Sequence, residues 1–188
     1  MRLVLATRNA HKVREFKALL PAHEVIPLPD NVDLPPETAD TFAGNALGKA
    51  RAAAAATGLA VIADDSGIES AALGGAPGVR SARYAGEDAT DAENLAKLLR
   101  EAPVGSALAY VCALAYVDEA GAEQVVEGRC TGTLAERPRG DGGFGYDPAF
   151  VPVDYDDGRT MAELAPGRKD AISHRGRAAR ELLELLGG

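Results

Sequence analysis

The chain has 188 residues, of which 46% are hydrophobic and 26% are charged. This length fits about 100–200 residues per domain and predicts one globular domain, residues 1–188, that folds without disulfides or a structural metal. The formal net charge of −8 disfavours non-specific binding to nucleic acid, although it does not exclude a single nucleotide in a local pocket. Because no apolar run is long enough for a signal peptide or a membrane span, we expect a cytoplasmic protein that does not bind membranes.

Apolar spacing and turn residues predict alternating strands and helices. Val13, Phe16 and Leu20 recur at i, i+3 and i+7, which is the spacing of one helix face. Two apolar segments on either side of 118–121 are typical of a hairpin. In chain order, the prediction is a strand at 2–6, the helix with Val13, a strand at 24–28, a loop at 29–40, a helix from its cap Thr41 to Thr57, a strand at Leu59–Ala63, a long loop at 74–90, a helix from its cap Asp91 to Arg100, strands at 106–117 and 122–133, a glycine-rich segment at 139–148, and a helix from Ser173 to Leu186.

This order of elements predicts an α/β fold in which helices flank a mixed sheet. In open sheets of this kind, ligands bind at the carboxyl ends of the strands. Cys112 and Cys130 are too few for a disulfide framework. We expect two buried thiols, although the hairpin spacing leaves one bridge open.

The turn after the first strand carries a candidate phosphate-binding segment, Thr7-Arg8-Asn9-Ala10-His11-Lys12. Backbone N–H groups at a helix N-terminus, and the partial positive charge there, both favour phosphate. Thr7 and Asn9 would add neutral donors, and Lys12 would add a positive charge. The alternative is a capped helix with Arg8 and Lys12 in solvent, and the spacing does not match a P-loop.

A second candidate, Asp64-Asp65-Ser66-Gly67, follows the apolar segment Leu59–Ala63. Two adjacent carboxylates at the end of a buried strand are unfavourable unless they are paired or bind a metal, and Mg²⁺ prefers carboxylate oxygens. The alternative is an ordinary turn, because Asp, Ser and Gly all favour turns. Glu37, in the proline-rich loop, is expected from spacing alone to be a solvated acid.

Two later segments are candidates for contacts with a ligand. Glycines surround Phe144 and Tyr146, which either leaves the two rings open for stacking on a base or places them in a core. His174 and Arg175 follow Ser173, which could simply cap the last helix. Cations in a first helical turn oppose the helix dipole, so we expect these two to face an anion or a polar ligand. Phosphate donors, an acidic turn and an aromatic slot together predict a nucleotide site with hydrolytic chemistry.

In order along nearly the whole chain, these segments resemble the inosine triphosphate pyrophosphatase family, in particular its bacterial dITP/XTP pyrophosphatase branch. The matching segments are ATRNAHK (Ala6–Lys12), ETADTFAGNA (Glu37–Ala46) with Lys49, ADDSGIE (Ala63–Glu69), LGGAPGVRSARYAGEDATD (Leu73–Asp91), GGFGYDPAF (Gly142–Phe150), MAEL (Met161–Leu164), Lys169 and ISHRGRA (Ile172–Ala178).

The resemblance implies an elongated mixed sheet with two lobes around a central cleft, and a homodimer. It implies Mg²⁺-dependent hydrolysis of ITP, dITP or XTP to the nucleoside monophosphate and pyrophosphate, which removes deaminated purines from the nucleotide pool. Asp65 is implied as the catalytic proton acceptor, and Glu37, Asp65 and Asp64 as the metal side of the site. The substrate-binding residues implied are Thr7, Arg8, Asn9, Ala10, His11, Lys12, Ser66, Phe144, Gly145, Tyr146, Asp147, Lys169, His174 and Arg175.

Two positions depart from the family pattern. Many relatives have a second acid before the one that matches Glu37, where this chain has Pro36. Arg8 stands where a small residue is common, so either a phosphate contact or a solvent-exposed side chain is open for it. Two other functions stay open as well: a Maf-like pyrophosphatase for modified nucleotides, and a nucleotide-binding regulator without turnover. Such a regulator needs no acidic cluster, so the acids of this chain favour an enzyme.

Overall fold

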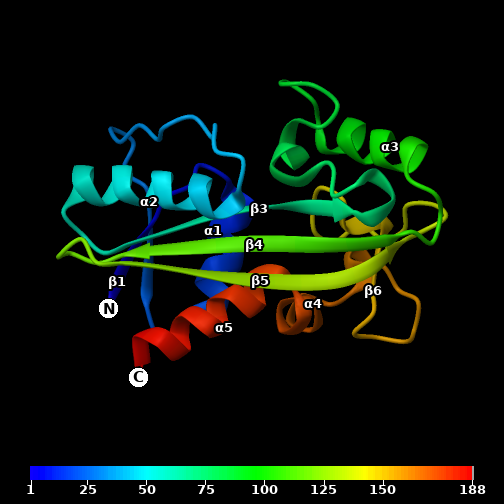
Figure 1. Cartoon of the computed structure of the whole chain (residues 1–188). Helices are drawn as coiled ribbons and strands as arrows, with labels where there is room; N and C mark the ends of the chain where they lie inside the picture. The colour runs from blue at the N-terminus through cyan, green and yellow to red at the C-terminus, as the bar shows by residue number, and fades with distance from the viewer. Residues whose placement is uncertain (188) are drawn as a thin grey trace. The chain divides into compact units, whose positions relative to one another are not determined.

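The computed structural model describes residues 1–187 of the chain. Over these residues the strands form a six-stranded sheet in the order β2-β1-β3-β4-β5-β6, and helices flank it (Figure 1). This is the mixed α/β class that the sequence predicts. The strands are β1 (Arg2–Leu5), β2 (Glu24–Pro27), β3 (Val61–Ser70), β4 (Ala107–Val117), β5 (Glu123–Leu134) and β6 (Phe150–Pro152). The α-helices are α1 (Ala10–Leu19), α2 (Phe42–Thr57), α3 (Asp91–Glu101), α4 (Pro166–Ile172) and α5 (His174–Gly187).

The chain divides into two compact units, which are described separately. The first comprises Met1–Asp65, Cys112–Gly128 and His174–Gly188, and the second comprises Ser66–Val111 and Arg129–Ser173. The long strands β3, β4 and β5 contribute residues to both units. A single domain with a cleft between two lobes stays a prediction.

Parallel pairing brings the segments that follow β1 and β2 to one edge of the sheet, beside the middle of β3. β1 lies between β2 and β3 and is parallel to both. Leu5 of β1 is opposite Pro27 of β2 and Ile62 of β3. The segments that follow β1 and β2 therefore leave the sheet at the same edge, beside Ala63–Asp65 of β3.

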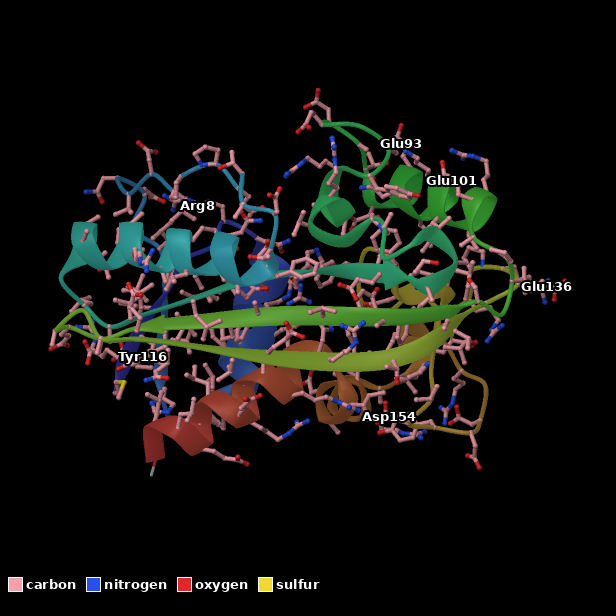
Figure 2. All side chains as sticks on the ribbon, viewed as in Figure 1. Arg8, Glu93, Glu101, Tyr116, Glu136 and Asp154 are labelled. Atoms are coloured by element: carbon pink, nitrogen blue, oxygen red, sulfur yellow. The ribbon has the colours of Figure 1, made fainter. Side chains whose placement is uncertain are left out.

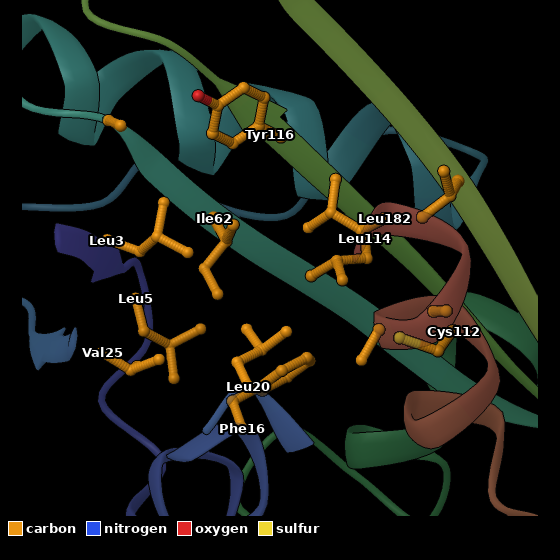
Figure 3. Close-up of a cluster of buried hydrophobic side chains, with 14 residues drawn as sticks. Leu3, Leu5, Phe16, Leu20, Val25, Ile62, Cys112, Leu114, Tyr116 and Leu182 are labelled. Atoms are coloured by element: carbon orange, nitrogen blue, oxygen red, sulfur yellow. The ribbon is translucent and has the colours of Figure 1, made fainter. Parts of the chain in front are cut away.

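The core of the first unit is built from the apolar periodicity seen in the sequence. Phe16 on α1, Leu20 directly after it and Leu182 on α5 pack with strand residues such as Ile62 and Leu114 (Figure 3). Full burial of one such side chain stabilises the fold by about 1.5–3 kcal/mol. This packing fixes α1 and α5 against the strands and so fixes the charged residues that these helices carry.

Local capping explains where the first two helices begin and end. The Asn9 side chain caps α1, and the Thr41 hydroxyl caps α2 by accepting a hydrogen bond from the Gly44 N–H. Helix α2 ends at Gly58, whose φ of 65° lies in the left-handed region that glycine adopts easily. The predicted cap and end of α2 are confirmed.

The second unit has its own apolar core. Ile68 of β3, Leu98 of α3, Tyr110 of β4 and Ile172 of α4 belong to it. The rings of Tyr110 and Phe150 lie with their centres 4.6 Å apart. Because Phe150 belongs to the short strand β6, which pairs antiparallel with β5, this contact helps to fix the glycine-rich segment that precedes β6.

Several predicted boundaries in this unit are wrong. Thr90, rather than Asp91, caps α3, because Thr90 and Glu93 form a reciprocal capping box. Gly78–Arg83 forms a 3₁₀ helix inside the predicted loop 74–90. Helix α4 and strand β6 were not predicted, because each is too short to show a clear apolar period.

Cys112 and Cys130 are both buried and form no disulfide with each other, which confirms the prediction of two buried thiols. Among residues 1–187, no helix combines the length and the apolar character needed to cross a membrane.

Candidate active site

The two adjacent acids lie inside a strand and not in the turn that the sequence predicts. β3 runs from Val61 to Ser70 and continues through Asp64 and Asp65. Successive strand residues point to opposite faces of a sheet, so the two carboxylates diverge. Partners on each face outweigh the preference of Asp for turns, and the strand is not interrupted.

Asp64 is fully buried and is held by two cations. Its Oδ2 lies 2.9 Å from Nζ of Lys12 and 3.4 Å from Nε of Arg175. Nη1 of Arg175 also lies 3.0 Å from Oε2 of Glu15. Burial alone would raise the pKa of Asp64, but the attraction of Lys12 and Arg175 outweighs it and lowers that pKa below its ordinary value. Asp64 is therefore ionised, and it anchors side chains of α1 and α5.

Asp65 has a different environment, beside α2. Its Oδ2 accepts a hydrogen bond of 2.8 Å from Nδ2 of Asn45. Burial raises the pKa of Asp65, and the negative charge of Glu37 raises it further; Asn45 and Lys49 offset only part of this. A carboxylate with a raised pKa is a stronger base, which suits proton transfer near neutral pH.

Lys49 is buried and connects the acidic groups. Its ammonium group contacts the Glu37 carboxylate and donates a hydrogen bond of 2.7 Å to the backbone oxygen of Asp64. Burial alone would lower the pKa of Lys49, but the charges of Asp64 and Glu37 reverse this and raise it. Lys49 is therefore a permanent positive charge at the acids, suited to balancing an additional anionic group.

Glu37 and Asp65 fit a hard divalent cation, whereas Asp64 does not. The repulsion that raises the pKa of Asp65 comes from Glu37, so a cation between the two carboxylates would relieve it. The charge of Asp64 is already balanced by Lys12 and Arg175. Within residues 1–187 there is no group of three or more His, Cys, Asp or Glu side chains placed to hold a metal. Mg²⁺ is usually bound by one or two carboxylates, with water and substrate phosphate completing its shell.

The candidate phosphate-binding turn is ordered by its own side chains. Oγ1 of Thr7 accepts a hydrogen bond of 3.2 Å from the Asn9 N–H. Oδ1 of Asn9 accepts hydrogen bonds of 2.8 and 3.3 Å from the N–H groups of His11 and Lys12. The turn is thus a capped helix start, with Lys12 directed to Asp64 and not to solvent. Phosphate binding by these residues stays a prediction.

Arg8 and Ala10 belong to the same turn. Ala10 is the first residue of α1. Arg8 directs its guanidinium group to backbone oxygens of the loop after β2. Arg8 is exposed to solvent, as one of the two expectations has it, but neither expectation includes this contact with the loop.

In the second unit, Asp147 organises the glycine-rich segment. Its Oδ1 accepts a hydrogen bond of 3.0 Å from the Tyr110 hydroxyl. Its Oδ2 accepts hydrogen bonds of 2.8 Å from Nζ of Lys169 and 3.0 Å from the Phe144 N–H. The Lys169 ammonium lies 5.3 Å from the centre of the Phe144 ring. The structure thus brings together three of the residues that the resemblance implies as substrate-binding, namely Phe144, Asp147 and Lys169.

The two aromatic residues of this segment differ. Tyr146 is buried, and its hydroxyl donates a hydrogen bond of 2.7 Å to the Ser81 backbone oxygen, so this ring belongs to the core. Phe144 is half-buried. The Gly145 N–H donates a hydrogen bond of 2.9 Å to the Asp91 carboxylate. Of the two rings, Phe144 is therefore the one suited to stacking on a ligand.

The remaining predicted residues are placed as follows. Ser66 is half-buried in β3, and His174 is buried at the start of α5 beside Arg175. Arg175 faces anions, as expected from its position in a first helical turn, but these anions are Asp64 and Glu15 of the protein itself.

The predicted site residues do not include four residues that shape these clusters, Glu15, Asn45, Lys49 and Tyr110, although Asn45 and Lys49 fall in the matching segments of the sequence. A signal for two of them was present, because Asn45 and Lys49 lie at i and i+4 on an alanine-rich helix and so share one face. Two polar residues on the buried face of such a helix are expected to have buried polar partners. Glu15 and Tyr110 carry no comparable signal, since their partners are far away in the sequence.

The fold and the site define an α/β protein in which Glu37, Lys49 and Asp65 form a charged cluster at β3. The comparison with known families is consistent with this class: the chain belongs to the Ham1 family, whose model matches residues 3–185.

Similar proteins cover almost the whole chain. A Geobacillus kaustophilus protein named dITP/XTP pyrophosphatase is 52% identical, over 99% of this chain and 96% of its own length. A Mycobacterium tuberculosis protein of the same name is 50% identical, over 98% of this chain and 95% of its own length. The structure of a HAM1 protein from Coxiella burnetii has a TM-score of 0.88 at 42% identity and covers 100% of this chain and 98% of that chain.

Proposed function

We propose that the chain is a house-cleaning enzyme that hydrolyses dITP, ITP and XTP to the nucleoside monophosphate and pyrophosphate. The observation that carries this proposal is the environment of Asp65, a buried carboxylate with a raised pKa beside Glu37 and Lys49. Relatives named dITP/XTP pyrophosphatase, at about half identity over nearly the full chain, support the choice of substrate. A regulator that only binds nucleotides would not need such a base.

We assign Asp65 as the general base that accepts a proton from the attacking water. Its raised pKa favours acceptance of a proton as the water approaches the α-phosphorus, and the Asn45 amide holds one carboxylate oxygen in a fixed orientation. Asp65 and Glu37 would hold a Mg²⁺ ion, which when bound offsets negative charge on the phosphates. The positive charges of Lys49 and Lys12 would stabilise the negative charge that develops on the phosphate oxygens.

Phe144, Asp147 and Lys169 support recognition of the base and sugar. The half-buried Phe144 ring would stack on any purine. His174 can donate a hydrogen bond, and we assign it to the 6-oxo group of hypoxanthine and xanthine, with Arg175, which Asp64 and Glu15 hold in place, as the residue beside it. Adenine carries an amino donor at the same position, which would disfavour ATP.

Hydrolysis of ITP in ¹⁸O-labelled water tests the proposal directly. We expect IMP that carries the label, together with unlabelled pyrophosphate, because the attack is at the α-phosphorus. IDP with labelled orthophosphate would assign the protein to a γ-phosphatase instead. Absence of turnover on a panel of ITP, XTP, dITP and modified pyrimidine nucleotides would support a binding regulator.

We further propose that the enzyme is a cytoplasmic homodimer. The substrates are free nucleotides of the intracellular pool, and the two buried thiols are compatible with a reducing compartment. Sedimentation equilibrium of the purified protein tests the dimer, and a monomer at micromolar concentration would contradict it.

A further inference from the structure

Arg8, in the turn between β1 and α1, binds the loop that follows β2. Its Nη1 donates a hydrogen bond of 2.9 Å to the Leu28 oxygen. Its Nη2 lies 2.9 Å from the Pro29 oxygen, 3.3 Å from the Asp30 oxygen and 2.7 Å from the Val32 oxygen. Figure 2 labels Arg8 at this loop, which runs from β2 to α2. One guanidinium group therefore lies within hydrogen-bond distance of four backbone oxygens in the segment 28–32.

Sheet topology explains why this contact forms. Leu5 and Pro27 are opposite each other in the parallel pair β1 and β2, so Arg8 and Leu28 both emerge at the same edge. The planar fork of arginine can donate several hydrogen bonds in fixed directions. A small residue at this position would leave the carbonyls without that donor.

The loop segment that Arg8 binds, residues 28–32, continues to Glu37. Leu28 and Val32 are buried and hold the start of the loop. Pro35 and Pro36 follow, and their locked φ angles make the segment before Glu37 stiff. Beyond Glu37, the Ala39 N–H donates a hydrogen bond of 2.9 Å to Oδ1 of Asn45.

Glu37 thus lies between two anchors. One is Arg8, at Leu28–Val32, and the other is Asn45, which also binds Asp65. We propose that Arg8 is a positioning residue that fixes the Glu37 carboxylate relative to Lys49 and Asp65. The inference rests on the proposed function only in the role it gives to Glu37. In this proposal Arg8 acts as a clamp, which means that its hydrogen bonds hold the loop in place. It does not act as a positive charge that binds phosphate.

Substitution of Arg8 by Lys and by Ala distinguishes a clamp on the loop from a ligand of phosphate. Lysine keeps the charge but lacks the fork, so a clamp is lost in both variants, whereas a phosphate ligand is partly retained in Arg8→Lys. We expect kcat/KM for ITP to fall about 10-fold in both, less than the roughly 100-fold that a 1 Å misplacement of a reacting group can cause. The half-saturating Mg²⁺ concentration should rise in both.

Hydrogen exchange gives a readout that does not depend on activity. The Val32 N–H donates a hydrogen bond of 3.1 Å to the Pro29 oxygen inside the loop segment that Arg8 binds. In nucleotide-free and metal-free protein, we expect faster exchange over residues 28–39 in Arg8→Lys and Arg8→Ala. The matched control is Arg159→Ala: that side chain is 44% exposed, similar to the 48% of Arg8, and it pairs with Asp157, which lies outside the loop of residues 28–39.

The outcomes distinguish failure of the Arg8 clamp from failure of the proposed function. Unchanged exchange over residues 28–39, or near-normal kcat/KM in Arg8→Lys with a loss in Arg8→Ala, overturns the clamp. Glu37→Gln is measured in parallel. If Glu37→Gln keeps full Mg²⁺-dependent activity, the role of Glu37 in the proposed function fails, whatever the exchange of the loop shows.

Discussion

Asp64 and Asp65 are consecutive residues of β3, yet their carboxylates have opposite electrostatic environments. Two cations, Lys12 and Arg175, bind Asp64 and lower its pKa against the effect of burial. Burial and the negative charge of Glu37 both destabilise the ionised form of Asp65, so its pKa is raised. The pleat of the strand, which sends alternate side chains to opposite faces, makes this separation possible. We expect one acid to stabilise the fold and the other to serve the reaction.

Replacement of Asp65 by Asn should separate activity from stability. We expect Asp65→Asn to lower kcat for ITP by about 10²–10⁴-fold, the usual effect of losing a general base. In metal-free buffer at pH 7, its thermal midpoint should be equal to or above that of the parent. The reason is that a raised folded-state pKa means the ionised carboxylate destabilises the fold above that pKa, and Asn removes this penalty.

The matched control for Asp65→Asn is Asp156→Asn, since Asp156 is exposed. It should leave both kcat and the thermal midpoint unchanged. If Asp65→Asn unfolds the protein or keeps activity within about threefold of the parent, the assignment of Asp65 as the base is wrong.

Asp64→Asn should have the opposite effect on stability. Removing one member of a buried ion pair leaves Lys12 without its partner carboxylate and Arg175 with Glu15 alone, and we expect the free energy of unfolding at pH 7 to fall by about 3–5 kcal/mol. Because the folded-state pKa of Asp64 is lowered, its stabilising effect is complete above its unfolded-state pKa of about 3.9 and is lost as the pH falls toward the folded value. Urea unfolding from pH 7 to pH 3 should show the difference between parent and variant shrinking below about pH 4. A constant difference over this range would contradict the assignment.

Mg²⁺ should raise the thermal midpoint of the nucleotide-free protein. A ligand that binds only the folded state stabilises it by about 2.7 kcal/mol at 100 times its Kd. The shift should be much smaller in Glu37→Gln and in Asp65→Asn, because both lose a carboxylate of the candidate metal pair. Asp64→Asn should retain a shift relative to its own metal-free midpoint, since Asp64 is not expected to bind the ion. A normal shift in Glu37→Gln would contradict the metal proposal.

Asp147 and Lys169 should show strong energetic coupling. Their buried pair, at 2.8 Å, has side chains only 5% and 10% exposed. We expect Lys169→Met alone to lower the free energy of unfolding by about 3–5 kcal/mol, and the double variant with Asp147→Asn to lose less than the sum of the two single changes. The exposed pair Arg159–Asp157 is the control cycle, with expected coupling of about 1 kcal/mol or less. Equal coupling in the two cycles would contradict the assignment of Asp147 as the organising residue.

Much of the fold follows from local sequence rules. The apolar spacing of Val13, Phe16 and Leu20, the Thr41 cap and Gly58 locate α1 and α2 to within a few residues. β6 and α4 could not be predicted, because β6 has three residues and ends at a proline, and the seven residues of α4 are mostly polar and show no apolar face. Tertiary contacts also override local preference in β3, where two turn-forming Asp residues continue a strand.

For the site, the sequence by itself determined the inventory: a capped helix start, two adjacent acids, an acid in a proline-rich loop and an aromatic segment among glycines. These are local patterns, so residue type and spacing are enough to find them. Only the tertiary structure decided how the charges pair. Lys12 and Arg175 form ion pairs with Asp64. Lys49 binds both Glu37 and the backbone of β3, and Arg8 donates hydrogen bonds to the loop before α2. Such pairings join residues that are 12 to 111 positions apart, and they depend on strand order, on the pleat and on which helix covers which face.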